Sequence, residues 1–187
     1  MSVAREQFIH TMCALLELQG YAATGLNQII KESGSPKGSL YHYFPGGKEE
    51  LTAQAIQQVA QVVLKRIEDS MAAVDDSPAE AIRDFLRNVA YNVELSGYRA
   101  GGPITTVALE TAATNERLRD ACAAIYLSWQ RAFAARLQAG GITPLRAERL
   151  AMLIISTLEG GILLCRVQRS RAPLEAAAEE LYTLINF

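Results

Sequence analysis

Residues 33–44 read Ser-Gly-Ser-Pro-Lys-Gly-Ser-Leu-Tyr-His-Tyr-Phe, and this stretch decides the fold. Gly34 can adopt the left-handed backbone conformation that ends a helix, because it has no Cβ. Ser35 can accept a hydrogen bond from the first free N–H groups of a new helix, and Pro36 suits the first helical position. The sequence therefore predicts that one helix ends and another begins within this turn.

The residues on both sides of the turn predict two short helices. The first spans about residues 25–32 and turns its apolar residues inward. In the second, Leu40 and Phe44 are separated by one helical turn, so they share a face and anchor the helix. Lys37 and the other polar residues of this helix then point elsewhere. Two short helices joined by a tight turn with glycine are typical of a helix-turn-helix, whose second helix can enter the major groove of DNA.

The flanking sequence predicts further helices. Residues 4–19 form an amphipathic helix that Gly20 ends, and either Thr24 or Gly25 caps the next helix. After the break at 45–47, a long helix runs from about 48 to 73 and links the N-terminal part to the remainder of the chain.

The C-terminal part of the sequence is also helical. Residues 75–80, Asp-Asp-Ser-Pro-Ala-Glu, carry a helix start with a Ser cap, Pro at the first position and Glu three residues after the cap. We find no strand pattern and no internal repeat, so we expect an all-α protein of about nine helices. The remaining helices are expected at about 78–95, 103–113, 115–139, from 144 to before Arg171, and 173–187.

The helix that begins at Pro144 is apolar on two sides. Leu150, Ile154, Leu158, Gly161 and Cys165 form one seam, and Met152, Ile155 and Ile162 lie opposite. A helix that is apolar on both faces must be covered on both. We expect one side to face the core of the chain and the other to face a second copy.

Composition and charge restrict the class of function. The 187-residue chain is half apolar and has a net charge of −2, which excludes DNA binding by bulk basicity. Residues 1–48 contain four Lys/Arg against three Glu, a surplus of one. Any affinity for DNA must therefore come from the placement of a few cations and from two copies of the chain.

Signals for a membrane protein or an enzyme are weak. No uncharged apolar run reaches the ~18–20 residues that span a bilayer, and the N-terminus lacks the apolar segment of a signal peptide. We therefore expect a cytoplasmic protein with no membrane partner. Gly46-Gly47-Lys48 resembles the end of a phosphate-binding loop, but Glu49 stands where Ser or Thr is needed.

The cysteines and histidines do not form a recognisable site. Cys13, Cys122 and Cys165 lie far apart in apolar helical contexts, so we expect reduced core thiols, with a redox-sensing role left open. His10 and His42 are the two histidines, and no Cys/His/carboxylate cluster is visible. We expect no catalytic residues, no metal and no cofactor.

Residues 24–51, Thr-Gly-Leu-Asn-Gln-Ile-Ile-Lys-Glu-Ser-Gly-Ser-Pro-Lys-Gly-Ser-Leu-Tyr-His-Tyr-Phe-Pro-Gly-Gly-Lys-Glu-Glu-Leu, resemble the helix-turn-helix of the TetR family of transcriptional regulators. The segment 37–44 carries the most specific part of the match. The exit Pro-Gly-Gly-Lys at 45–48 and the segment 102–110, Gly-Pro-Ile-Thr-Thr-Val-Ala-Leu-Glu, resemble the LmrA/YxaF-like branch. The exit is one residue longer than the usual turn of the family, and Gly25 replaces a common threonine.

The resemblance implies a DNA-binding head at 1–50 and a helical effector-binding and dimerisation domain at 51–187. It also implies a homodimer through the last two helices, which binds a palindromic operator and releases it when a small hydrophobic effector binds. The sequence does not fix whether such a regulator represses or activates, nor does it identify the effector. A helix-turn-helix that acts without an effector, or that binds a protein, is the alternative.

Transferred residue by residue, the resemblance implies a set of DNA contacts. Lys37 is expected to read a base edge, because lysine can donate to guanine O6 and N7. Asn27 and Lys48 are expected to hold flanking phosphates, Lys48 with help from a helix N-terminus. Tyr41 and Tyr43 have an alternative role in packing the three-helix head. The expected DNA-binding residues are Asn27, Ser35, Pro36, Lys37, Gly38, Ser39, Tyr41, His42, Tyr43 and Lys48.

The C-terminal sites are expected on the helices around the implied effector cavity and on the last two helices. Aromatic residues with a few polar groups suit a planar, mostly apolar ligand, although each is also compatible with an ordinary core or surface position. The expected effector residues are Tyr91, Thr105, Glu110, Tyr126, Trp129, Phe133 and Glu159. The expected dimer interface comprises Leu150, Ile154, Leu158, Gly161, Cys165 and Leu181.

Overall fold

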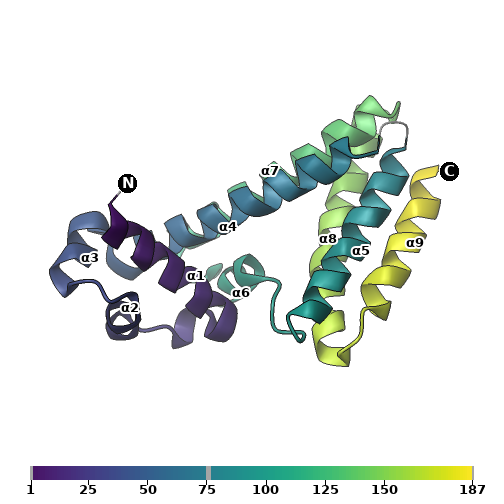
Figure 1. The fold of residues 1–187 in the computed structure, drawn as a ribbon. Helices are drawn as coiled ribbons and strands as arrows, with labels where there is room; N and C mark the ends of the chain where they lie inside the picture. Colours follow the sequence, from purple (N-terminus) through teal and green to yellow (C-terminus); the bar gives the residue numbers. More distant parts are fainter. Residues whose placement is uncertain (1, 75–76, 187) are drawn as a thin grey trace. The chain divides into compact units, whose positions relative to one another are not determined.

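The computed structural model describes residues 2–74 and 77–186, and these form nine α-helices without a strand (Figure 1). The predicted all-α class is confirmed. The helices are α1 Val3–Ala23, α2 Leu26–Ser33, α3 Lys37–Tyr43, α4 Gly47–Ala72, α5 Pro78–Leu95, α6 Pro103–Thr111, α7 Glu116–Ala139, α8 Pro144–Gln168 and α9 Ala172–Asn186.

These helices divide into two compact units. The N-terminal unit contains the described residues up to Gln61 together with Gly102–Ile125, and the C-terminal unit contains Val62–Gly101 and the described residues from Tyr126 onward. Helices α4 and α7 contribute residues to both units. The expected division at residue 50 is a functional one and stays a prediction.

Gly34 allows the backbone to turn between α2 and α3. Gly34 adopts φ 64° and ψ 11°, and its N–H donates to the Lys31 carbonyl at 3.4 Å, which ends α2. The expected Ser35 cap is wrong. Pro36 occupies the cap position with φ −60° and ψ 139°, while the buried Ser35 hydroxyl donates to Gln7 Oε1 at 2.9 Å. Ser35 therefore ties the turn to α1 rather than capping α3.

Two apolar side chains hold α3 in place. Leu40 and Phe44 are both fully buried, and Phe44 meets the Phe8 ring of α1 edge to face, with centroids 6.2 Å apart. Ile29 of α2 is also fully buried. The predicted anchoring face of the second short helix is thus confirmed.

The C-terminal end of α1 is kinked and packs against α6. Gly20 adopts φ 78° and kinks α1, which continues to Ala23 beyond the predicted stop, and Gly25 is the residue that caps α2. A Cβ on Gly20 would collide with the Glu110 carboxylate of α6. Glu110 Oε2 accepts a hydrogen bond from the Ala22 N–H at 2.7 Å. A segment from the later sequence therefore belongs to the N-terminal unit.

The C-terminal unit is built around α5, α8 and α9, which pack on one another. Phe85 of α5 meets Phe133 of α7 with ring centroids 5.5 Å apart. Arg136 of α7 donates to the carbonyls of Met71 at 3.0 Å and Val74 at 2.6 Å, and so holds the end of α4.

Among the described residues, α8 is the one helix long and apolar enough to cross a membrane. Its best 18-residue window has a mean hydropathy of 1.8, and 44% of that window is buried within the structure. The core helix of a soluble protein has the same properties, so this is a weak sign of a membrane span.

The start of α5 generates a prediction about stability. Ser77 Oγ accepts a hydrogen bond from the Glu80 N–H at 3.2 Å, as the capping pattern predicts; Asp75 and Asp76 lie outside the described residues. Ser77→Ala should lower the free energy of unfolding by about 0.5–2 kcal/mol, because a helix N–H loses its acceptor. Urea denaturation followed by circular dichroism measures this.

Ser77→Asp is the matched control, because aspartate caps a helix as well as serine does. Equal stability of the alanine and aspartate variants would contradict the capping role.

Candidate nucleic-acid interface

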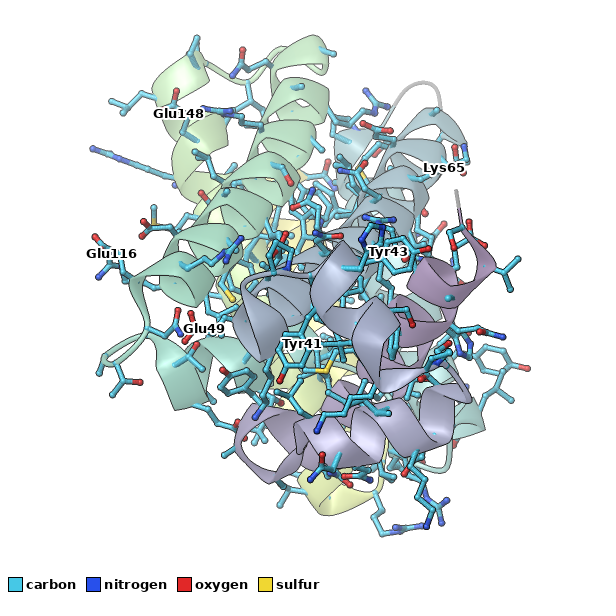
Figure 2. The ribbon with its side chains drawn as sticks, turned by 90° about the vertical axis from the view of Figure 1, so that its left-hand side faces the viewer. Tyr41, Tyr43, Glu49, Lys65, Glu116 and Glu148 are labelled. Atoms are coloured by element: carbon cyan, nitrogen blue, oxygen red, sulfur yellow. The ribbon has the colours of Figure 1, made fainter. Side chains whose placement is uncertain are left out.

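Helix α3 presents its polar face to solvent. With Leu40 and Phe44 buried, Lys37, Tyr41 and His42 are exposed, and Tyr41 is 49% exposed. Figure 2 is turned so that the side carrying α2 and α3 faces the viewer, and Tyr41 and Tyr43 are labelled there. The expected residues of α3 therefore lie together on one short helix, whereas Ser35 is buried in the turn that precedes it.

Lys37 is the most available cation of this face. It is the first residue of α3, and its ammonium makes no hydrogen bond or ion pair with any residue in the described ranges. Pro36 and Gly38 beside it are exposed as well. An extended, unengaged ammonium at the start of a helix can donate to acceptors on a base edge or to a phosphate.

Two other polar groups of α3, the hydroxyls of Ser39 and Tyr43, already have partners. Ser39 Oγ donates to the Pro36 carbonyl at 2.6 Å, and the Tyr43 hydroxyl donates to Ser2 Oγ at 2.8 Å. The His42 and Tyr43 rings meet edge to face at 4.9 Å. Contact with DNA would replace these local hydrogen bonds with bonds to the duplex. A DNA-binding role of these groups therefore stays a prediction.

Asn27 and Lys48, expected at the flanking phosphates, differ in their surroundings. Asn27 is exposed on α2. Lys48 Nζ donates to the Tyr21 carbonyl at 2.6 Å and lies 3.9 Å from the centroid of the Tyr21 ring. Burial lowers the pKa of Lys48, an effect that the carboxylate of Glu110 opposes. The ammonium of Lys48 therefore helps to hold the end of α1, and its contact with a phosphate stays a prediction.

The expected effector residues are divided between the two units. Thr105 and Glu110 belong to the N-terminal unit, where Glu110 is engaged by Ala22. The other five belong to the C-terminal unit. Their surroundings differ: Tyr126 and Trp129 meet edge to face at 5.6 Å, Phe133 is fully buried, Glu159 is half-buried and Tyr91 is exposed.

Tyr91 lines an open hollow of about 590 Å³ between α5 and α9. Arg87 and Glu179 form an ion pair at 2.7 Å in the wall of this hollow, and Arg171 lies 6.0 Å from the Tyr91 ring centroid. The hollow is therefore lined by charged groups that already compensate one another. It differs from the enclosed apolar cavity that a planar effector requires.

The three thiols are poor nucleophiles in this structure. Burial raises the pKa of Cys13 and of Cys122 to about 11, so both are protonated at neutral pH. Cys165 is fully buried. Since the thiolate is the reactive form, these surroundings favour structural thiols. Within the described ranges, no group of three or more His, Cys, Asp or Glu residues could hold a metal.

The residues of the expected dimer interface are buried within the single chain, and their role in a dimer stays a prediction. Leu150, Ile154 and Leu158 are at most 3% exposed within the single chain, and the other three expected residues are buried too. Of the three residues expected on the opposite side of α8, Met152 is exposed, whereas Ile155 and Ile162 are buried. The exposed apolar residues of α8 are Leu145, Met152, Leu153, Leu163, Leu164 and Val167, named here the α8 outer face.

Comparisons with known proteins agree on the family. Residues 2–55 match the family described as bacterial regulatory proteins, tetR family, and residues 78–180 match the transcriptional regulator LmrA/YxaF-like C-terminal domain. The chain is 42% identical to the uncharacterized HTH-type transcriptional regulator YxaF of Bacillus subtilis (strain 168), over 97% of this chain and 95% of that protein. It is 39% identical to the HTH-type transcriptional regulator LmrA of the same strain, over 91% and 90%.

Solved structures share the fold. A TetR transcriptional regulator from Chloroflexus aurantiacus J-10-FL has a TM-score of 0.80 at 30% identity, covering 98% of this chain and 94% of that one. A cysteine mutant of the TetR family regulator CifR, complexed with 26-bp double-strand operator DNA, has a TM-score of 0.82 at 21% identity, covering 96% and 95%. These relatives are regulators rather than enzymes. The chain therefore belongs to the TetR family of DNA-binding transcriptional regulators, with a C-terminal domain of the LmrA/YxaF-like type.

Proposed function

We propose that this chain is a repressor that binds a palindromic operator as a homodimer and is released by a small hydrophobic effector. The observation that carries the DNA-binding part is the exposed start of α3, where the Lys37 ammonium is unengaged and Leu40 and Phe44 fix the helix from behind. The operator complex of CifR, which shares the fold, supports the binding of an operator by this chain. Cytoplasmic location follows from a DNA partner.

A second copy strengthens the binding of DNA, because a single head at 1–50 contains four Lys/Arg against five Glu. Helix-turn-helix dimers present two recognition helices about 34–36 Å apart, one turn of duplex, or a multiple of that distance. The α8 outer face supports a dimer, because Met152 and Leu163 are each 59% exposed and Val167 is 74% exposed. Such a contiguous apolar face on a soluble protein indicates a protein interface.

A small effector is the least direct part of the proposal. Release by a hundredfold requires a ligand that favours the released state by about 2.7 kcal/mol. Tyr126 and Trp129 offer aromatic surface for a planar ligand. Regulation without an effector is the second candidate, favoured by the full burial of Phe133 against Phe85 and by the engagement of Glu110 with Ala22.

Selection of the protein on random duplex DNA tests the proposal as a whole. We expect a palindromic site, and we expect that a panel of planar hydrophobic compounds contains at least one that weakens binding to that site. Failure to enrich any duplex would overturn the DNA-binding assignment. Enrichment that no compound reduces would favour the candidate without an effector.

Lys37 should carry sequence specificity. Lys37→Ala should cost about 1–3 kcal/mol on the selected operator and relax the preference at one base pair of each half-site, because a base-edge donor is lost. Binding titrations on the operator and on single-base variants measure both effects. Lys65→Ala is the control, since Lys65 is an exposed lysine on α4 that pairs with Asp69 at 3.0 Å. Identical behaviour of the two variants would remove Lys37 from the readout.

The α8 outer face should hold the dimer together. Leu163→Glu should produce monomers, because a charge replaces an exposed leucine at the proposed interface, while the fold of the single chain is unaffected. Sedimentation velocity measures the association state. Leu109→Glu is the control: Leu109 is 82% exposed on α6, outside this face. A Leu163→Glu protein that remains dimeric would place the interface elsewhere.

A further inference from the structure

The exit turn after α3 contains two glycines, Gly46 and Gly47. Gly47 adopts φ 63°, a left-handed conformation that favours glycine. Gly46 has no positive φ, so its backbone does not demand glycine. A Cβ on Gly46 would instead lie 2.7 Å from Arg117 Nη1 and 3.1 Å from Glu50 Oε2. The Arg117 guanidinium therefore lies close to Gly46.

Arg117 comes from the first turn of α7, yet it lies in the same compact unit as the helix-turn-helix. Its side chain is exposed and makes no hydrogen bond or ion pair with any residue in the described part of the chain. Glu50, the nearest carboxylate to the turn, accepts hydrogen bonds from the Gly46 N–H at 2.8 Å and from Gln54 Nε2 at 3.3 Å. The Arg117 guanidinium therefore lies beside the turn, and its donors are unused within the described part of the chain.

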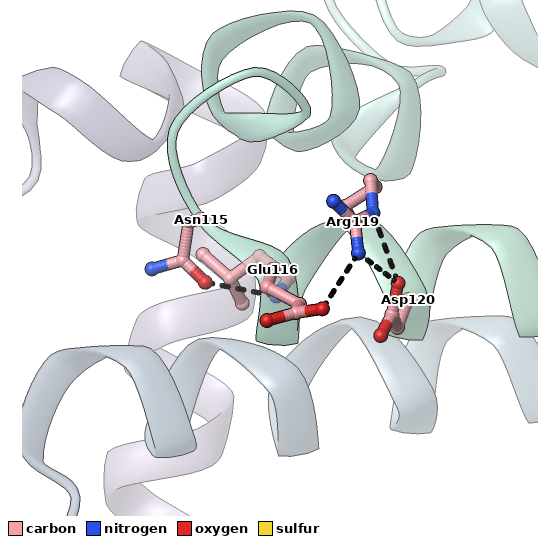
Figure 3. A network of polar contacts seen from close by, with 5 residues as sticks. Asn115, Glu116, Arg119 and Asp120 are labelled. Atoms are coloured by element: carbon pink, nitrogen blue, oxygen red, sulfur yellow. Dashed lines mark hydrogen bonds and ion pairs between the residues drawn. The ribbon is translucent and has the colours of Figure 1, made fainter.

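Arg119, two residues further along α7, shows the opposite situation. It donates to Glu116 Oε1 at 3.2 Å and to Asp120 Oδ1 at 3.0 Å, so two carboxylates compensate its charge (Figure 3). The same short segment thus carries one arginine that is fully paired and one that is not. This contrast separates Arg117 from an ordinary surface arginine in an ion-pair network.

Lys48, the cation that the family resemblance assigns to the exit turn, is engaged elsewhere. Its ammonium donates to the Tyr21 carbonyl and lies over the Tyr21 ring. Arg117 brings a guanidinium to the same turn from α7. A guanidinium is better suited than an ammonium to a phosphate, because its planar fork can donate two parallel hydrogen bonds.

We propose that Arg117 contacts a phosphate of the operator backbone beside the exit turn of α3, where the sequence alone assigns Lys48. This inference rests on the proposed entry of α3 into the major groove, since phosphates flank that groove on either side of the recognition helix. Arg117 then fixes the register of the head on DNA without reading bases.

The charge of the N-terminal unit makes such a contact important. The described residues of this unit contain more acidic than basic side chains, so a phosphate contact depends on an individual, well-placed cation. The six basic residues are Arg5, Lys31, Lys37, Lys48, Arg117 and Arg119, and the eight acidic residues are Glu6, Glu17, Glu32, Glu49, Glu50, Glu110, Glu116 and Asp120.

The test compares Arg117→Ala with Arg119→Ala in the full-length protein. Affinity for the selected operator and for an unrelated duplex is measured from about 0.05 to 0.3 M salt, and the slope of log K against log salt is determined. Arg117→Ala should weaken binding to both duplexes about tenfold and reduce the slope by about 2 for a dimer, one lost phosphate contact in each protomer. Arg119→Ala should change neither quantity.

Arg117→Lys provides a second readout. It keeps the charge but loses the planar fork, so the salt slope should be retained while affinity falls by less than in the alanine variant. Circular dichroism of each variant confirms that the exposed substitution leaves the fold intact.

The possible results separate this inference from the proposed function. A wild-type protein that enriches no duplex overturns both. A normal loss of specificity in Lys37→Ala, together with equal behaviour of Arg117→Ala and Arg119→Ala, overturns the role of Arg117 alone. Weaker binding of Arg117→Ala with an unchanged salt slope also overturns it, because Arg117 would then merely position the exit turn.

Discussion

The burial of Leu40 and Phe44 is the constraint on which the proposed interface depends. Helix α3 has seven residues, too few for an isolated helix to be stable in water. Its position therefore comes from packing, above all from the edge-to-face contact of Phe44 with Phe8. Once these two side chains point inward, helical geometry directs Lys37, Tyr41 and His42 outward. Exposure of the polar face is thus a consequence of the anchor.

Local signals in the sequence predicted the local features well. Gly34 ends α2 and Ser77 caps α5, because each depends only on neighbours within a few residues. Ser35 shows the limit of such reasoning. Its hydroxyl has a local use as a cap, but Gln7, distant in sequence, offers a partner inside the three-helix head. The cap position then falls on Pro36, which has no side-chain acceptor to contribute.

Apolar periodicity could not predict which side of α8 packs against the same chain and which side is exposed. Both sides of α8 are apolar, and a helical pattern alone does not state which side meets α5 and α9 of the same chain. The structure buries Leu150 and Leu158 and exposes Met152 and Leu163. Arg117 was missed for a related reason. No motif connects an arginine of α7 with the exit turn of α3, and their proximity results from the packing of helices distant in sequence.

The position of a cation in a motif does not determine what the cation does. Lys48 stands where the family resemblance implies a phosphate contact, but the structure gives its ammonium a carbonyl acceptor and an aromatic face. Partial burial lowers its pKa, and the carboxylate of Glu110 works in the other direction. Lys48 and Glu110 thus both stabilise the kinked end of α1, one from α4 and one from α6.

This arrangement bears on how an effector could act. A hundredfold release from DNA requires about 2.7 kcal/mol, and a hydrogen bond to a charged group contributes about 1.5–3 kcal/mol. The bond from the Ala22 N–H to Glu110 is of that kind, and Gly20 leaves the space that it needs. In the proposed release by an effector, the loss of this contact between α6 and α1 would be comparable in magnitude to that requirement.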